Sequence, residues 1–377
     1  MNGTLKKDVP FFSFGTLIVM VVFAIGAYAA LYRFQHGLGA ATHLTDDVPW
    51  GLWIAFDVLA GVALAAGGFS ITAAVYVFNM KKYKPIARPA ILTAFIGYLL
   101  VVIGIVIDIG QPLRFWHPLV MWQHHSVMFE VVWCITLYST VLGLEFAPAF
   151  LERLKLNFLL KVLKFFMFPL VIAGIVLSFL HQSSMGGFFL IMPAKVNPLW
   201  YSSNLPYLFY ISAIAVGLAM VSFESVVSAW AFKREQEHDI LTGLGKGIAI
   251  TLVVYVVAKV GDLAYQGALS QAFSGTIASK MFLLELVGGF IMPLVLLALP
   301  AVRQSVSGVF FSAVLVIAGV MLNRFNTNFF AQLGNGVSYF PTGREIAITL
   351  GLIALGVLMF RMAVKFLPIF HEAEAEH

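Results

Sequence analysis

This chain has few charged residues for its length. Of its 377 residues only 11% are Asp, Glu, Lys or Arg, while 60% are hydrophobic. Average globular chains carry about 25% charged residues, so this chain lacks the polar surface that a soluble body of its size requires. That shortage excludes a water-soluble enzyme, a nucleic-acid-binding protein and a disordered chain.

Cysteine is almost absent, since Cys134 is the single one and lies inside an apolar run. One thiol excludes an intrachain disulfide, and it cannot hold an iron–sulfur cluster or a structural zinc ion. We therefore expect no metal site built from this chain. A cleavable signal peptide is not evident either, because the first apolar run is too long for the hydrophobic core of such a peptide.

Long apolar runs dominate what is present. A helix needs about 20 apolar residues to cross the hydrocarbon core of a bilayer, and ten runs reach that length. Lipid admits only helices or closed barrels, and runs this long are typical of helices. The sequence thus predicts an all-α, polytopic membrane protein that forms a single integral membrane domain over 1–377. Its expected spans are 11–33, 50–79, 87–108, 124–147, 159–181, 205–231, 244–262, 277–299, 303–323 and 345–367.

Spans 2–5 and spans 6–9 resemble each other. The same offset along the chain relates Asp108 to Asp262, each at the end of a span, and aligns apolar residues of spans 2 and 6. A copy with an even number of helices keeps its orientation in the membrane. The pattern therefore predicts two parallel four-helix repeats, 50–181 and 205–323, with spans 1 and 10 flanking them.

Charge is distributed unequally between the two sides of the predicted bundle. With ten spans both termini lie on one side, and most of the 23 Lys and Arg residues lie there too. The positive-inside rule then predicts that both termini are cytoplasmic. The loops on the outer side, such as 34–49, 109–123 and 182–204, are long and have tryptophans in or beside them, so we expect a partner to dock there.

Several ionisable groups lie within the predicted spans. Charges at membrane depth are costly, and their presence indicates function by default, although a carboxylate near a helix end often has only a structural role. Glu130, Tyr138 and Glu145 follow helical spacing along one stripe of span 4. The residues that we expect to carry protons are Asp57, Arg88, Tyr98, Glu130, Tyr138, Glu145 and Glu224.

Histidines gather at the outer ends of spans 4 and 5. An imidazole can donate a hydrogen bond to a quinone carbonyl and pass a proton near neutral pH. A b-type haem instead needs opposed histidines at buried depth, and the three present lie at one edge. The residues expected to bind a quinone are Trp53, Asp57, His124, His125, Glu130 and His181.

Two motifs resemble a known family. Residues 49–69, Pro-Trp-Gly-Leu-Trp-Ile-Ala-Phe-Asp-Val-Leu-Ala-Gly-Val-Ala-Leu-Ala-Ala-Gly-Gly-Phe, resemble the second span of the HybB-type membrane subunit of respiratory [NiFe] hydrogenases. Residues 129–138 and 144–146 resemble its fourth span. This subunit belongs to the wider NrfD/PsrC-like family of quinone-interacting subunits, and the resemblance extends over almost the whole chain.

The resemblance has specific implications. It implies a subunit without haem in the inner membrane of a bacterium, with a quinone site near the outer face, for either menaquinone or ubiquinone. It also implies a periplasmic ferredoxin-like iron–sulfur subunit as partner, next to the small and large hydrogenase subunits. Asp57, Glu130, His181 and Glu224 match its acidic and quinone-site pattern, and Arg88 and Tyr98 match more loosely.

We therefore interpret the chain as the quinone-reactive, non-autonomous membrane subunit of a respiratory complex. It would pass electrons between the iron–sulfur subunit and the quinone pool in anaerobic respiration, with possible proton translocation. Two alternatives stay open. One is a secondary transporter, which the repeat and the buried acids favour. The other is the membrane subunit of a different NrfD-like oxidoreductase.

Overall fold

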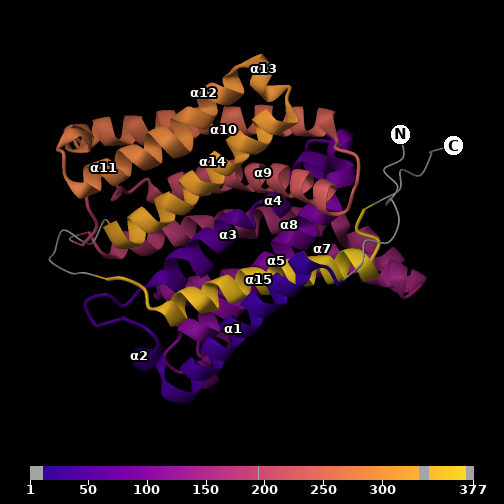
Figure 1. Cartoon of the computed structure of the whole chain (residues 1–377), viewed down its shortest axis with the longest axis horizontal. Helices are drawn as coiled ribbons and strands as arrows, with labels where there is room; N and C mark the ends of the chain where they lie inside the picture. The colour runs from indigo at the N-terminus through magenta and orange to yellow at the C-terminus, as the bar shows by residue number, and fades with distance from the viewer. Residues whose placement is uncertain (1–11, 194, 331–338, 371–377) are drawn as a thin grey trace.

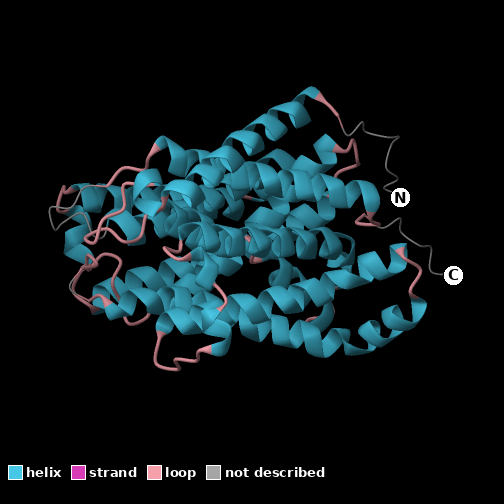
Figure 2. Cartoon of the chain, turned by 90° about the horizontal axis from the view of Figure 1, so that it is seen from below, coloured by secondary structure: helices cyan, strands magenta, loops and turns pink. Residues whose placement is uncertain are grey.

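The computed structural model describes residues 12–193, 195–330 and 339–370. Within these ranges the chain is helical and contains no strand, and ten helical segments are long and apolar enough to cross a membrane. The helices run side by side, and the loops gather at the two ends of the bundle (Figure 2). The prediction of an all-α, ten-span membrane protein is confirmed.

Several spans are composed of more than one helical segment, and spans 2 and 8 each contain a π-helical stretch. The spans in chain order are α1 (Phe14–His36); η1 (Trp53–Ala60), α3 (Gly61–Leu64), α4 (Gly67–Thr72) and η2 (Ala73–Val77); η3 (Lys81–Tyr83) and α5 (Lys84–Asp108); α7 (Val127–Arg153); α8 (Asn157–Gly187) and η5 (Phe188–Ile191); α9 (Leu205–Ala231); α10 (His238–Tyr265); α11 (Ile277–Leu283), η7 (Leu284–Ile291) and α12 (Met292–Ala298); α14 (Val306–Phe325) and η8 (Asn326–Phe330); and α15 (Gly343–Phe366). Short helices in the connections are α2 (Leu38–Ala41), η4 (Pro112–Arg114), α6 (His117–Val120), η6 (Leu269–Phe273) and α13 (Pro300–Arg303).

Hydroxyl side chains set where many of these helices begin. The side chain of Ser126 accepts a hydrogen bond from the N–H of Phe129 at the start of α7, and Thr342 forms a capping box with Glu345 at the start of α15. Such caps satisfy amide groups that the helix itself leaves without partners. The two caps therefore fix where α7 and α15 begin, next to the loops that precede these helices.

The first and last spans lie together and give the bundle two distinct ends. Helix α1 packs along α15, and α1 begins where α15 ends (Figure 1). We call that end of the bundle the terminal end, and the opposite end the distal end. The long loops 37–52 and 109–126 lie at the distal end.

Two groups of helices meet at the centre of the molecule. Spans 2–5 pack on one another, as do spans 6–9, and the groups touch where α3, α4 and α8 pack against α9 and where η1 packs against α14. Gly217 allows the close approach there, because a Cβ atom at this position would lie 2.7 Å from the carbonyl carbon of Ala66. The duplication of 50–181 as 205–323 stays a prediction.

One helix continues beyond its expected end. Span 5 was expected to end at residue 181, but α8 continues to Gly187. The side-chain amide of Gln182 in this extension donates to the carbonyl of Val62 inside the bundle at 3.0 Å, and the Ser183 hydroxyl donates to the carbonyl of Leu180 in the same helix at 2.9 Å. As a result His181 lies within the bundle and is fully buried.

Candidate functional site

A cavity of about 380 Å³ lies at the distal end, between η1, α5, α7 and α8. Its wall is mostly apolar, and its polar groups come from neighbouring segments: Asp108 ends α5, His117 and Gln123 follow in the next loop, and Ser126 caps α7. An apolar pocket of this size with a few convergent polar groups is the usual form of a small-molecule site. We call it the distal cavity.

One carboxylate oxygen of Asp108 is available to accept a hydrogen bond in this cavity. Its Oδ1 atom is buried and has no hydrogen-bond partner within the described part of the chain. The guanidinium of Arg33 from α1 lies near it and donates to the carbonyl of Ile109 at 2.6 Å. Because buried polar atoms are normally satisfied, Asp108 is the group in the wall best placed to accept a hydrogen bond from a ligand.

Glu130 lies beside the distal cavity and points toward α8. Its neighbours Phe129 and Val131 line the cavity, whereas its carboxylate accepts a hydrogen bond from the hydroxyl of Ser184. The Glu130 side chain is exposed in the isolated chain. It therefore connects the rim of the cavity with the polar side chains of α8.

His181 continues this connection toward the middle of the bundle. It lies one turn from Ser184, is fully buried, and has no hydrogen-bond partner at either ring nitrogen in the described structure. The ring of Tyr98 from α5 meets it edge-on with centroids 5.5 Å apart, and Tyr98 in turn meets Tyr138 of α7 at 4.6 Å. Three titratable rings from three helices are thus adjacent.

The polar groups continue toward the terminal end. The hydroxyls of Tyr98, Tyr138 and Ser178 are all buried and have no hydrogen-bond partner in the part of the chain that the structure describes. Further along, Glu145 is buried against Gly174 of α8, where an added Cβ atom would lie 3.0 Å from its Oε1 atom. Buried hydroxyls of this kind are the groups that ordered water satisfies. We call the set Glu130, Ser184, His181, Tyr98, Tyr138, Ser178 and Glu145 the polar file.

A second hollow runs beside spans 2, 3, 6 and 10. This groove of about 380 Å³ has an apolar wall, with Asp57 toward the distal end and Glu224 toward the terminal end. Asp57 accepts a hydrogen bond from Thr349 at 2.8 Å, and Glu224 accepts one from Thr93 at 2.6 Å. We call it the lateral groove. The lateral groove therefore has two of the predicted proton-carrying carboxyl groups in its wall, one toward each end.

None of the six residues expected to bind a quinone lines the distal cavity. Trp53 is buried, and its indole donates to the carbonyl of Glu345 in α15 at 3.2 Å. His124 and His125 are exposed at the distal end. Asp57 faces the lateral groove, while Glu130 and His181 belong to the polar file beside the cavity. The assignment of these six residues to quinone binding stays a prediction.

Arg88, expected to carry protons, lies at the terminal end in an ion pair. Its guanidinium contacts the carboxylate of Glu152 at 2.7 Å and donates to the carbonyl of Pro368 at 3.0 Å. These contacts tie α5 to α7 and to the segment after α15. Its place in a proton pathway therefore stays a prediction too.

Sequence reasoning missed the polar wall of the distal cavity. The sequence placed Asp108 at the end of a span without a binding role, and His117 and Gln123 lie in a segment without periodicity. A usable signal exists, because all three belong to one segment between spans 3 and 4 that also carries aromatic side chains. Only the folded loop shows that these groups converge.

Sequence reasoning also missed the partners of Glu285. This fully buried carboxylate lies in η7 and accepts hydrogen bonds from the side chains of Trp200, Asn323 and Asn326 at 2.9, 2.7 and 2.6 Å. Lys259 does not pair with its neighbour Asp262, and instead donates to the carbonyl of Leu199 at 2.8 Å. The cluster is well partnered, which favours a structural role in spans 6–9.

Metal ligation is not apparent in the described ranges. Within 12–193, 195–330 and 339–370, no group of three or more His, Cys, Asp and Glu side chains is arranged to hold an ion. The chemistry that these residues offer is hydrogen bonding and proton transfer.

Comparisons with known proteins identify the family of this architecture. The sequence profile of a family described as polysulphide reductase, NrfD, matches residues 40–333. The probable Ni/Fe-hydrogenase 2 b-type cytochrome subunit of Escherichia coli is 36% identical, over 96% of this chain and 92% of that protein. The integral membrane subunit of menaquinone reductase from Nitratidesulfovibrio vulgaris is 31% identical, over 95% and 91%. The integral membrane subunit of an Hdr-like menaquinol oxidoreductase from Archaeoglobus fulgidus is 24% identical, over 96% and 94%.

One expectation is corrected by these relatives. The Escherichia coli protein is named a b-type cytochrome subunit, and that name indicates haem. Our expectation of a subunit without haem is therefore wrong. Within the described ranges His181 alone among the histidines is buried, and its unpartnered ring nitrogens fit one axial ligand. The described residues do not supply the second buried imidazole that bis-histidine ligation needs.

Proposed function

This chain belongs to the NrfD family, and we propose that it is the quinone-reactive membrane subunit of a respiratory oxidoreductase complex. Its electrons come from a periplasmic ferredoxin-like iron–sulfur subunit and pass to the quinone pool, menaquinone or ubiquinone. A [NiFe] hydrogenase is the favoured partner, because the hydrogenase relative is similar over nearly the full length of both chains. The menaquinone reductase relative supports a second candidate, another oxidoreductase with an NrfD-type subunit.

The observation that carries this proposal is the distal cavity with the free acceptor of Asp108 in its wall. A quinone supplies the redox chemistry, because its ring takes up two electrons and two protons. The apolar wall suits the ring, while His117 and Gln123 are positioned to donate hydrogen bonds to its oxygens. Asp108 accepts a hydrogen bond from the hydroxyl of the reduced quinol, or donates one to a quinone oxygen when its carboxyl group is protonated. The protein thus contributes orientation and proton access.

The polar file supports delivery of protons to that cavity. Glu130 stands beside the cavity, and from Glu130 to Glu145 the file covers about 22 Å along α7 at 1.5 Å per residue. His181 and Tyr138 provide exchangeable protons between them. The lateral groove supports a second connection, in which Asp57 and Glu224 hold protons at its two ends.

Charge and loop structure support the orientation in a bacterial inner membrane. The basic residues lie mainly at the terminal end, which we therefore assign to the cytoplasm. The distal end then faces the periplasm. Its loops expose Trp116 and Trp122, which favour docking of the iron–sulfur subunit there, followed by the small and large hydrogenase subunits.

The test uses the intact complex in membranes and the substitution Asp108→Asn. The amide keeps the shape but removes the carboxylate acceptor and the acid, so we expect hydrogen-dependent quinone reduction to fall by about tenfold or more. Hydrogen-dependent reduction of a soluble viologen dye, which bypasses this subunit, stays unchanged. Asp47→Asn, an exposed acid in a distal loop, is the matched control. Quinone reduction in the Asp108 variant equal to that in the control would contradict the proposal.

A further inference from the structure

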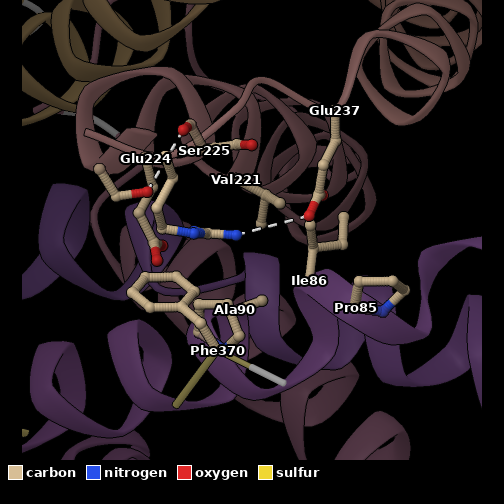
Figure 3. A pocket seen from close by; sticks show the side chains of 11 residues that line it. Pro85, Ile86, Ala90, Val221, Glu224, Ser225, Glu237 and Phe370 are labelled. Carbon is tan, nitrogen blue, oxygen red and sulfur yellow. Dashed lines mark hydrogen bonds and ion pairs between the residues drawn. The ribbon is translucent and has the colours of Figure 1, made fainter. Parts of the chain in front are cut away.

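A small cavity lies at the terminal end and shares Glu224 in its wall with the lateral groove. Its volume is about 10 Å³, which is enough for a single water molecule. Figure 3 shows the carboxyl groups of Glu224 and Glu237 on its two sides, with the ring of Phe370 across one wall. The full lining is Pro85, Ile86, Pro89, Ala90, Val221, Glu224, Ser225, Ser228, Arg234, Glu237 and Phe370.

The loop between α9 and α10 is folded so that its charges face this cavity. Lys233 adopts a left-handed backbone conformation with φ of 53°, and the N–H of Arg234 bonds to the carbonyl of Ala229 at 2.8 Å. This is the pattern of a Schellman cap, which ends α9 and reverses the chain. The turn brings Arg234 and Glu237 against the bundle, whereas Glu235 between them is exposed.

The charged groups of the loop are incompletely satisfied. A guanidinium nitrogen of Arg234 lies 3.5 Å from Glu237 Oε1, and the guanidinium also lies 3.7 Å from the centre of the Phe370 ring. The Nε atom of Arg234 and the Oε2 atom of Glu237 are buried and have no hydrogen-bond partner among the described residues. Burial raises the pKa of Glu237, and the charge of Arg234 partly offsets this. Glu237 is thus a carboxyl group that can hold or release a proton.

Glu224 connects this cavity with the lateral groove. Glu224 and Ser228 line both hollows, and the groove continues from them to Asp57. The ionisable side chains around the small cavity are Glu224 from α9 and Arg234 and Glu237 from the loop; α5 and the segment after α15 contribute only uncharged side chains. On α5, Pro89 has no N–H to donate to the carbonyl of Pro85, which leaves that carbonyl an acceptor in this wall.

We propose that Glu237, with Arg234 and Phe370, forms the port through which protons from the cytoplasm reach Glu224. The proposal rests on the function proposed above. In each transfer the O–H bond of Glu237 breaks as its proton passes to the cavity water, and that water gives one of its protons to the Glu224 carboxylate. Glu237 then recovers a proton from bulk water. Arg234 positions Glu237 through one carboxylate oxygen and leaves the other free, while Phe370 closes the cavity.

The decisive variant is Glu237→Gln in the intact complex reconstituted in proteoliposomes, with Glu235→Gln as matched control. We expect quinone turnover in Glu237→Gln to fall by about tenfold or more and to recover on addition of azide, a small weak acid that carries protons past a blocked group. Glu235→Gln keeps full turnover. Glu237→Asp retains a carboxyl group and keeps most of the turnover.

Two results would overturn the port. One is equal turnover in Glu237→Gln and Glu235→Gln; the other is a loss in Glu237→Gln that azide does not restore, since an ion pair needed only for folding cannot be replaced by a weak acid. Failure of the port is distinguishable from failure of the proposed function. If Asp108→Asn blocks quinone reduction while Glu237→Gln is fully active, the quinone site stands and only this port is wrong.

Discussion

At the scale of single residues, the carboxyl groups of spans 2–6 differ in their surroundings. Glu130 is exposed next to the distal cavity and bonds to Ser184, whereas Glu145 is buried against α8 with no charged partner. Glu224 has Thr93 as a donor and faces two hollows. Substitution of these three carboxyl groups should therefore have different effects on quinone reduction. Among the three, we expect the strongest effect at Glu130, which lies nearest the distal cavity.

The substitution Glu130→Gln tests whether Glu130 donates protons to the quinone in the distal cavity. The amide retains the shape and the hydrogen bond from Ser184, but it cannot act as an acid, so we expect quinone reduction to fall by about 100-fold or more. Assembly and dye reduction stay normal. Quinone kinetics in membranes across a range of pH provide the measurement, and normal turnover would show that Glu130 has no part in the proton supply.

Individual residues also show where prediction from sequence works and where it stops. The carboxyl groups at membrane depth were identified because a charge in an apolar run is visible without a structure. The contact of Trp53 with α15 could not be inferred from sequence, because a stripe of apolar residues does not say which neighbour it faces, and its role in quinone binding stays a prediction. His117 shares a segment with Asp108 and Gln123, but that segment has no periodicity from which the direction of its side chains could be inferred.

At the scale of elements, the spans were predicted well because length and hydropathy alone set them. The expected bounds of span 6, 205–231, agree with α9, while α8 was expected to end too early. The last turns of α8 contain Gln, Ser and Gly, and these residue types favour a loop when only the local sequence is considered. Tertiary hydrogen bonds, such as that from Gln182 to Val62, keep them helical.

Contacts between distant elements were beyond prediction. The carboxylate of Glu285 takes its donors from the loop before α9 and from the end of span 9. No spacing rule connects these segments. The same holds for the small cavity at the terminal end, which needs α5, α9, a loop and the segment after α15 to come together.

The crossing of α4 and α9 offers a test of how the two groups of helices are held. Gly217→Ala places a Cβ atom 2.7 Å from the carbonyl carbon of Ala66, so the helices must separate. We expect the complex to lose about 1–3 kcal/mol of stability, measured as a lower temperature of thermal inactivation in detergent. Gly261→Ala on α10 is the control, because no atom lies within 4 Å of its added Cβ. Equal stability of the two variants would contradict this view of the crossing.

At the scale of the whole molecule, the proposed quinone site and the proposed proton entry lie at opposite ends. The distal cavity is near the proposed partner, while Glu224 and the loop 232–237 are at the terminal end. Protons from the cytoplasm would therefore cross most of a bilayer core of about 30 Å to reach the quinone. The polar file and the lateral groove each extend along part of this distance.

The central claim is that quinone binds in the distal cavity, and site-directed photolabelling tests it most directly. The intact complex is illuminated with a photoreactive azidoquinone, and the labelled residues are identified by mass spectrometry. We expect label in residues 117–132 and 185–188, which contribute much of the cavity wall, and loss of that label when excess menaquinone competes. Competed label confined to α15 or to spans 6–9, with none in these two segments, would contradict the account.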